Sequence, residues 1–133
     1  MRRILAIDFG ERYIGFAISD ENRLISSPLF EIDTRKRCFK KILDELIREY
    51  KPLEILFGEP RSISGKKLEL ANKIKKISEE IEREYKIKVV FWDEWETTKL
   101  AKKHKKNIHA ISASYLLQDY LDFLYNKKKS EKE

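Results

Sequence analysis

The first third of the chain contains short, nearly unbroken runs of apolar residues. These runs predict strands over about 3–9, 13–19 and 23–32, separated by turns rich in glycine and charged residues. No predicted helix separates the three strands. We therefore expect an antiparallel meander, because parallel neighbours need long crossover connections.

In the rest of the chain, helices are predicted to alternate with strands. Apolar residues recur every three or four positions over about 35–50 and 68–85, which predicts two amphipathic helices. Two more apolar runs predict strands at 53–57 and 89–92. A last helix is expected to begin near Asn107, since asparagine is a favourable N-cap residue.

The predicted elements fit a single domain over residues 1–126, with the order of an α/β protein: three strands, helix, strand, helix, strand, helix. A short additional helix is expected over about 97–101. Residues 127–133 contain no apolar side chain, so we expect them to form a charged, disordered tail.

Composition narrows the class of protein. Of the 133 residues 41% are hydrophobic and 39% are charged, which indicates a globular chain with a highly charged surface. The net charge of +6 favours a polyanionic partner, although a solvated, lysine-rich surface explains it equally well. Cys38 is the single cysteine, which excludes an internal disulfide and fits a reducing, cytoplasmic location. No apolar stretch approaches the roughly 20 residues of a membrane span, so no membrane association is expected.

Three predicted strands end at an acidic residue: Asp8, Glu59 and Glu94. Ligand sites in open α/β sheets lie at strand ends. Three carboxylates that converge there would repel one another unless a cation lies between them. The pattern therefore predicts a divalent metal site formed by these acids.

Glycines follow the first of these acids. Gly10 permits a tight turn after Asp8, and Gly15 leaves room for another backbone or a ligand to approach. This stretch alone leaves two interpretations open. It is either a hairpin whose turn contains an acid, or a strand end that directs Asp8 at a metal or a phosphate.

Four motifs, in order, resemble those of the YqgF/RuvX family. These bacterial RNase H-like proteins are described as candidate pre-16S rRNA nucleases and, earlier, as candidate Holliday junction resolvases. The matching segments are Asp8-x-Gly10-x-x-x-Ile14-Gly15-x-Ala17-x-Ser19-Asp20, Gly58-x-Pro60, Asp93-Glu94-x-x-Thr97-Thr98 and Ala110–Asp122. Together they cover the chain to about Leu124.

The resemblance implies an RNase H-like fold, with a five-stranded mixed sheet, three antiparallel strands first and then parallel ones, and helices on both faces. It implies a nuclease that depends on Mg²⁺ or Mn²⁺ and processes the 5′ end of pre-16S rRNA in ribosome biogenesis. Branched DNA is the alternative substrate, and a catalytically weak nucleic-acid-binding protein is the alternative function. The family's catalytic acids fall on Asp8 and Glu94, while its third acid, at the start of the last helix, is replaced by His109.

His109 and Glu59 each have two interpretations. The imidazole of His109 either replaces the carboxylate, as a ligand or by positioning water, or is an exposed helix-start residue. A nitrogen ligand would favour Mn²⁺ over Mg²⁺. Glu59 is either the missing oxygen ligand or a loop acid. Asp93 is expected to point away from Glu94, because strand neighbours face opposite sides.

Basic and aromatic residues near these motifs are candidates for binding the substrate. The candidates for phosphate contact are Arg12, Lys66, Lys67, Lys105 and Lys106, each of which taken singly can also be a solvated surface charge. Trp95 can stack on an unpaired base. The Asp-x-Gly sequence also resembles the phosphate loop of actin-like ATPases, but those enzymes pair two such domains and this chain supplies one.

Overall fold

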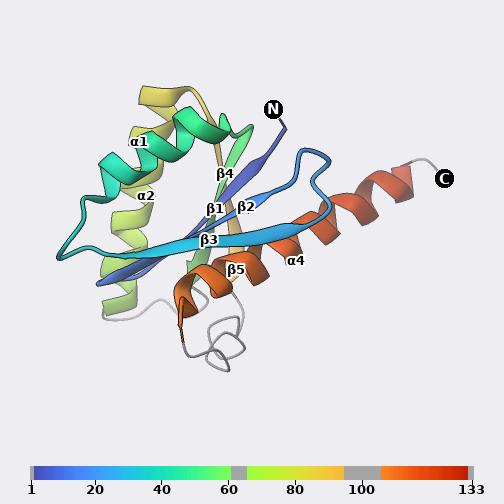
Figure 1. Ribbon diagram of the computed structural model, residues 1–133. Helices are drawn as coiled ribbons and strands as arrows, with labels where there is room; N and C mark the ends of the chain where they lie inside the picture. Colours follow the sequence, from blue (N-terminus) through green and yellow to red (C-terminus); the bar gives the residue numbers. More distant parts are fainter. Residues whose placement is uncertain (1, 61–65, 95–105, 132–133) are drawn as a thin grey trace.

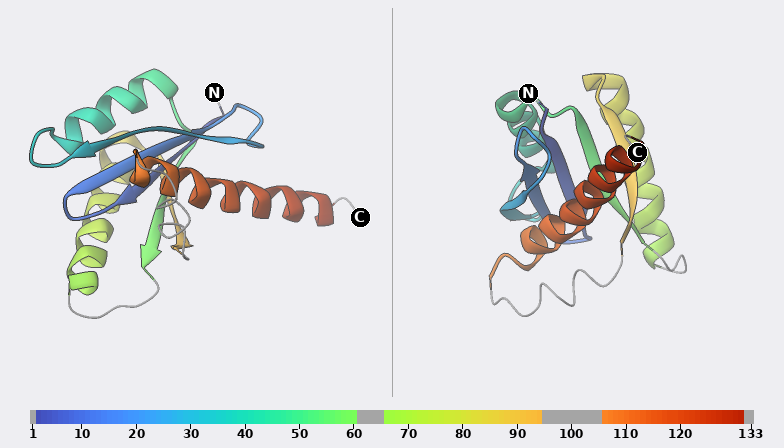
Figure 2. Two further views of the ribbon diagram at one scale, coloured as in Figure 1. Left: turned by 60° about the horizontal axis from the view of Figure 1, so that its bottom comes forward. Right: turned by 90° about the vertical axis from the view of Figure 1, so that its right-hand side faces the viewer.

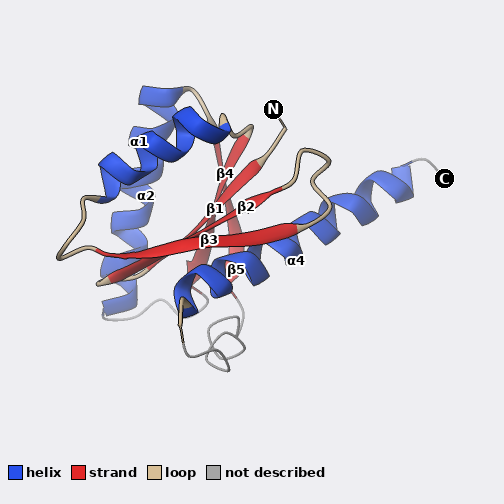
Figure 3. Cartoon of the chain, viewed as in Figure 1, coloured by secondary structure: helices blue, strands red, loops and turns tan. Residues whose placement is uncertain are grey.

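The computed structural model describes residues 2–60, 66–94 and 106–131. Within these ranges the chain forms one sheet and the helices that cover it (Figures 1 and 3). The elements, in chain order, are β1 (Ile4–Phe9), β2 (Tyr13–Ser19), β3 (Ser26–Asp33), α1 (Phe39–Tyr50), β4 (Glu54–Pro60), α2 (Lys66–Tyr85), β5 (Lys88–Glu94) and α4 (Ile108–Glu131).

The described strands form a five-stranded sheet in the order β3-β2-β1-β4-β5. The pairs β1–β2 and β2–β3 are antiparallel, whereas β1–β4 and β4–β5 are parallel. All six residues of the central strand β1 are buried. The mixed sheet predicted from the sequence is therefore confirmed.

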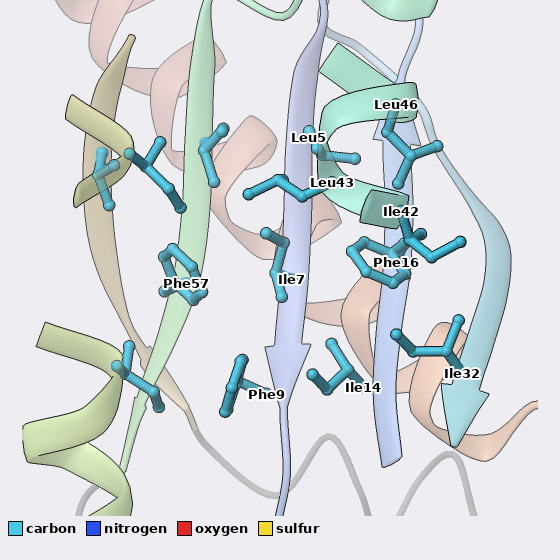
Figure 4. Packing of buried hydrophobic residues seen from close by; sticks show 14 of the residues in the cluster. Leu5, Ile7, Phe9, Ile14, Phe16, Ile32, Ile42, Leu43, Leu46 and Phe57 are labelled. Carbon is cyan, nitrogen blue, oxygen red and sulfur yellow. The ribbon is translucent and has the colours of Figure 1, made fainter. Parts of the chain in front are cut away.

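One face of the sheet is covered by α1 and α2. Leu5, Ile7 and Phe9 of β1 point to this face, where they meet large side chains of the neighbouring strands (Figure 4). The amphipathic helix α1 contributes Ile42, Leu43 and Leu46 to the same cluster, as its periodicity predicts. Burial of this apolar surface contributes roughly 25 cal/mol per Å² to stability, and makes this face the larger core of the protein.

The other face is covered by α4, whose C-terminal half extends beyond the sheet (Figures 1 and 2). Ile4, Ala6 and Ala17 point to this side and pack against the apolar stripe of the helix. The helix residues in this cluster are Ala113, Leu116, Leu117, Tyr120 and Leu121. Helices on both faces were expected, and the structure confirms them.

Two elements, β3 and α1, begin several residues later than predicted, because polar groups bind the backbone that precedes them. The strand expected from 23 begins at Ser26, since the Asp20 carboxylate accepts hydrogen bonds from the backbone N–H groups of Leu24 and Ile25. The helix expected from 35 begins at Phe39, because residues 34–37 form turns closed on the carbonyl of Asp33.

The last helix also differs from the prediction. It continues to Glu131, so residues 127–131 are helical where a disordered tail was expected. Lysine and glutamate are strong helix formers, and lysines in the last turn interact favourably with the helix dipole. The helix expected over 97–101 lies outside the described residues. Among the described helices, none is both long and apolar enough to cross a bilayer.

Candidate active site

Three residues form a row across the antiparallel half of the sheet. Asp8 of β1 pairs with Gly15 of β2, and Gly15 pairs with Glu31 of β3. Both carboxylates contact the first turn of α4, and the glycine between them has no side chain. The row therefore places two acids on either side of a gap that faces the N-terminus of a helix.

The first turn of α4 fills this gap. A methyl group at Gly15 would overlap the backbone of His109 and Ala110. The close backbone approach expected at Gly15 is therefore confirmed, and the approaching segment is the start of α4. Because only glycine fits here, the sequence of β2 fixes how closely the helix end can approach the sheet.

His109 is the second residue of α4, and its side chain points back toward β1. Its Nδ1 lies 3.7 Å from Oδ2 of Asp8. Its ring stacks on that of Tyr13, with centroids 5.5 Å apart and planes 20° from parallel. Asp8 is buried, whereas the imidazole is 29% exposed. A reactant arriving from solvent can therefore reach the imidazole beside a largely buried carboxylate.

Glu31 holds the backbone of His109. The N–H of His109 donates a 3.0 Å hydrogen bond to Oε1 of Glu31. Asn107 begins the helix as expected, since its carbonyl accepts the N–H of Ile111. An acid at a helix N-terminus satisfies an N–H that lacks an intrahelical partner, and it also interacts favourably with the helix dipole. The sequence patterns did not predict Glu31, because its place in the site depends on the pairing of Gly15 in β2 with Glu31 in β3.

Arg12 lies in the turn before Tyr13 and extends the stacked arrangement. Its guanidinium carbon lies 5.0 Å from the centre of the Tyr13 ring, and its Nη2 lies 3.2 Å from Oδ2 of Asp33. The hydrogen bonds that Arg12 donates to the Asp33 carboxylate raise the pKa of Arg12. The pKa of Asp33 is lowered first by the backbone N–H of Arg35 and then by Arg12. Arg12, Tyr13, His109 and Asp8 thus follow one another in contact, and a phosphate at Arg12 would compete with Asp33.

Glu59 lies on the opposite face from Asp8. The parallel register pairs Ile7 with Phe57, and both side chains point toward α1 and α2. Glu59 follows Phe57 by two residues and lines a pocket against α2. The structure does not bring Glu59 to Asp8. Side chains alternate between the two faces of a strand, so the residue of β4 that shares the face of Asp8 is Gly58, and Glu59 points to the other face.

Comparison with known proteins gives the family. The family model RuvX, described as a Holliday junction resolvase, matches residues 2–123. The chain belongs to this family. Its relatives include proteins named as candidate pre-16S rRNA nucleases from Caldicellulosiruptor saccharolyticus and Agathobacter rectalis. The first is 36% identical, with 92% of this chain and 98% of the relative covered; the second is 33% identical, with 95% and 99% covered.

The fold of this RuvX-family chain is also found in a resolvase. Thermus thermophilus RuvC in complex with a Holliday junction substrate gives a TM-score of 0.55 at 15% identity, covering 91% of this chain and 94% of that one. At this identity the likeness concerns the fold alone. It confirms the RNase H-like fold that the motifs implied.

The remaining predicted residues of this RuvX-family site are placed only in part. Glu94 is the last residue of β5 and pairs with Pro60, but its side chain and that of Asp93 lie outside the described structure. The same holds for the side chains of Lys66 and Lys67, which open α2, and for all of Trp95 and Lys105. Lys106 is exposed just before α4.

The donors needed for a metal are present in part. Asp8 offers carboxylate oxygens and His109 an imidazole nitrogen, a pair that suits Mn²⁺ better than Mg²⁺. Among the described residues, no group of three or more histidine, cysteine or acidic side chains is arranged to hold a metal. A further ligand has to come from outside that set, and Glu94 is the candidate that the family motif offers.

Proposed function

We propose that the protein is a metal-dependent nuclease that cleaves structured nucleic acid, and that Asp8 and His109 belong to its active site. The observation that carries the proposal is the placement of His109. Its ring lies beside Asp8 and stacks on Tyr13, while its backbone is held by Glu31. Three independent contacts fix a residue that, if it were only an exposed helix-start residue, would not require them. Glu94 is proposed to complete the site.

The residues of the site have separable roles in this proposal. Asp8 and Glu94 supply carboxylate oxygens, and His109 supplies a nitrogen to the metal or to a water molecule beside it. A bound divalent ion would lower the pKa of a water and stabilise the leaving oxygen. Arg12 and Lys106 are exposed close to this end of the sheet and α4, where they can contact phosphates. Lys66, Lys67, Trp95 and Lys105 remain candidates for the same surface.

The substrate proposed first is the 5′ end of pre-16S rRNA, with a role in ribosome biogenesis. Relatives that carry this name match at 33–36% identity over almost their whole length. A four-way DNA junction is the second candidate, favoured by the description of the family model and by the RuvC complex. The net charge of +6 supports either polyanion.

The test is cleavage of two labelled substrates, an RNA spanning the 5′ end of 16S rRNA and a four-way DNA junction, with Mg²⁺ or Mn²⁺. We expect RNA cleavage by the native protein and background rates for Asp8→Asn. The exposed variant Glu45→Gln on α1 is the control for charge loss and should cleave normally. Cleavage by a folded Asp8→Asn protein would contradict the proposed site, and cleavage of the junction alone would select the second substrate.

The role of His109 needs its own variants. His109→Ala should lose most of the cleavage, whereas His109→Asp should retain or raise it and shift the preferred metal from Mn²⁺ toward Mg²⁺. Equal rates for the native protein and His109→Ala with both metals would remove His109 from the mechanism.

A further inference from the structure

A pocket of about 310 Å³ lies on the face of the sheet opposite His109, between β4, β5 and α2. Glu59, Leu68, Ala71, Asn72, Lys75 and Phe91 are among the residues that line it. We call it the α2 pocket. Neither the proposed cleavage site nor the family motifs use its side chains, apart from the expectation that Glu59 would bind a metal.

The α2 pocket combines an aromatic surface with polar side chains. The Phe91 side chain is 38% exposed, and its ring packs on that of the buried Phe57 at a centroid distance of 6.2 Å, with planes 27° from parallel. The Phe57 ring therefore supports the Phe91 ring from one side. Leu68 and Ala71 add apolar wall, while Glu59 and Asn72 are exposed polar groups at the same pocket.

This combination fits a nucleobase. A base has two flat apolar faces and a hydrogen-bonding edge, and stacking on an aromatic side chain is how unpaired bases are commonly bound. An aliphatic ligand would leave the carboxylate of Glu59 and the amide of Asn72 without a role. Lys75, which is also exposed at the pocket, can contact the phosphate that accompanies the base.

We propose that the α2 pocket binds an unpaired guanine of the substrate, with Phe91 stacking on the base and Glu59 accepting from its edge. An ionised carboxylate can only accept hydrogen bonds. Guanine presents two adjacent N–H donors, at N1 and N2, on its pairing edge. Adenine and cytosine present a donor beside an acceptor, and uracil presents a donor between two carbonyl oxygens, which repel a carboxylate. Glu59 thus selects guanine.

The position of the pocket makes it usable by the same substrate. The carboxyl ends of the parallel strands β1 and β4 lie at one edge of the sheet, so Asp8 and Glu59 lie near the same edge on opposite faces. A nucleic-acid strand bound at Asp8 can therefore place a nearby unpaired base in the α2 pocket. The inference rests on the proposed function, because it takes nucleic acid to be the substrate.

The experiment measures binding without cleavage. Fluorescein-labelled pentanucleotides of uridine, with guanosine, inosine or adenosine at the centre, are titrated with the full protein in EDTA and followed by anisotropy. We expect guanosine to bind about tenfold more tightly than adenosine, within the range for a good bidentate contact, and inosine, which lacks the N2 amino group, to lie between them.

Matched variants separate the two contacts. Glu59→Gln should abolish the preference for guanosine, whereas Glu69→Gln, which removes the same charge from the first turn of α2 outside the pocket, should retain it. Phe91→Leu should weaken all three oligonucleotides about tenfold, because stacking does not distinguish bases. Thermal unfolding of each variant verifies that it is folded.

Equal affinity of the native protein for guanosine and adenosine would overturn the proposal, as would an unchanged preference in Glu59→Gln. The failure of the proposed function gives a different result. Suppose that the protein shows no cleavage but still prefers guanosine, and that this preference depends on Glu59. That result would support the pocket and contradict the nuclease proposal. If cleavage depends on Asp8 without any selection of guanosine, the reverse holds.

Discussion

Along the central strands β1 and β2, the two faces of the sheet are built mostly from side chains of different size. The face under α1 and α2 contains large apolar residues such as Leu5, Phe16 and Phe57, and the helices stay at the distance these side chains impose. The face under α4 contains Ala6, Ala17 and Gly15, and the helix backbone reaches the strand at Gly15. On one face bulky side chains separate the helices from the sheet, and on the other small residues let the helix backbone come close to the strands.

This difference assigns different roles to the two faces. Large side chains exclude water and stabilise the fold, but they keep the helix backbone away from the sheet. Small side chains contribute less buried area, but they let a helix N-terminus lie beside the acids of neighbouring strands. The polar groups of the site, Asp8, Glu31 and His109, therefore gather on the α4 face.

The largest expected effect on stability comes from the face under α1 and α2. Phe57→Ala should lower the free energy of unfolding by about 3–5 kcal/mol, because it removes a completely buried ring from the core. Urea denaturation measures the loss. Phe91→Ala removes the half-exposed partner ring and should cost much less. A loss for Phe57→Ala as small as that for Phe91→Ala would contradict the assignment of this face as the main core.

Gly15→Ala should affect both stability and cleavage. The added methyl overlaps the backbone of His109 and Ala110, so α4 has to move away from β2. We expect a loss of about 1–3 kcal/mol from overpacking and the loss of most cleavage by the folded protein. Leu46→Ala on α1, assayed below its unfolding temperature, should cleave nearly normally, because it removes a buried side chain that does not line the α2 pocket. Normal cleavage by Gly15→Ala would show that the position of α4 does not control the site.

Glu31 gives a smaller and more specific effect. Glu31→Ala should cost about 1 kcal/mol, as for the loss of a helix cap, and should lower cleavage because the start of α4 is held less firmly. Glu31→Gln keeps an acceptor oxygen and should recover most of both. Thermal unfolding and cleavage rates measure the pair. If Glu31→Ala behaves like the native protein, the hydrogen bond to His109 does not position it.

The smallest expected effect is a pH dependence at the turn before β3. Hydrogen bonds from the backbone of Ile25 and Leu24 lower the pKa of Asp20. A carboxyl group whose folded pKa is below its unfolded value of about 3.9 stabilises the fold above that pH. This contribution is lost as pH falls through the folded pKa.

Asp20→Asn should therefore narrow the difference in melting temperature between pH 6 and pH 2.5, with Glu45→Gln as the control. An unchanged difference would show that the turn does not couple to stability. The turn is also joined to α4, because Nε2 of Gln118 donates a hydrogen bond to the carbonyl oxygen of Leu24.

The sequence by itself determined the elements and much of their pairing. Apolar runs located β1 and β2, and the repeat over about 35–50 predicted an amphipathic helix, α1, whose Ile42, Leu43 and Leu46 lie in the core. These features are local, because a strand or a helix shows its period within its own residues. The close approach at Gly15 was also readable, since a glycine in a strand marks a crowded position.

Only the tertiary structure decided which acids lie together. Glu31 reaches the site through the register of β2 and β3, and Glu59 is directed to the other face by the register of β1 and β4. A shift of one residue in either register would exchange the faces, and the acids alone do not specify it. The sequence therefore predicted which kinds of residue form the site. Which of the described residues lie together there was decided by strand pairing and by the close approach of the α4 backbone to Gly15.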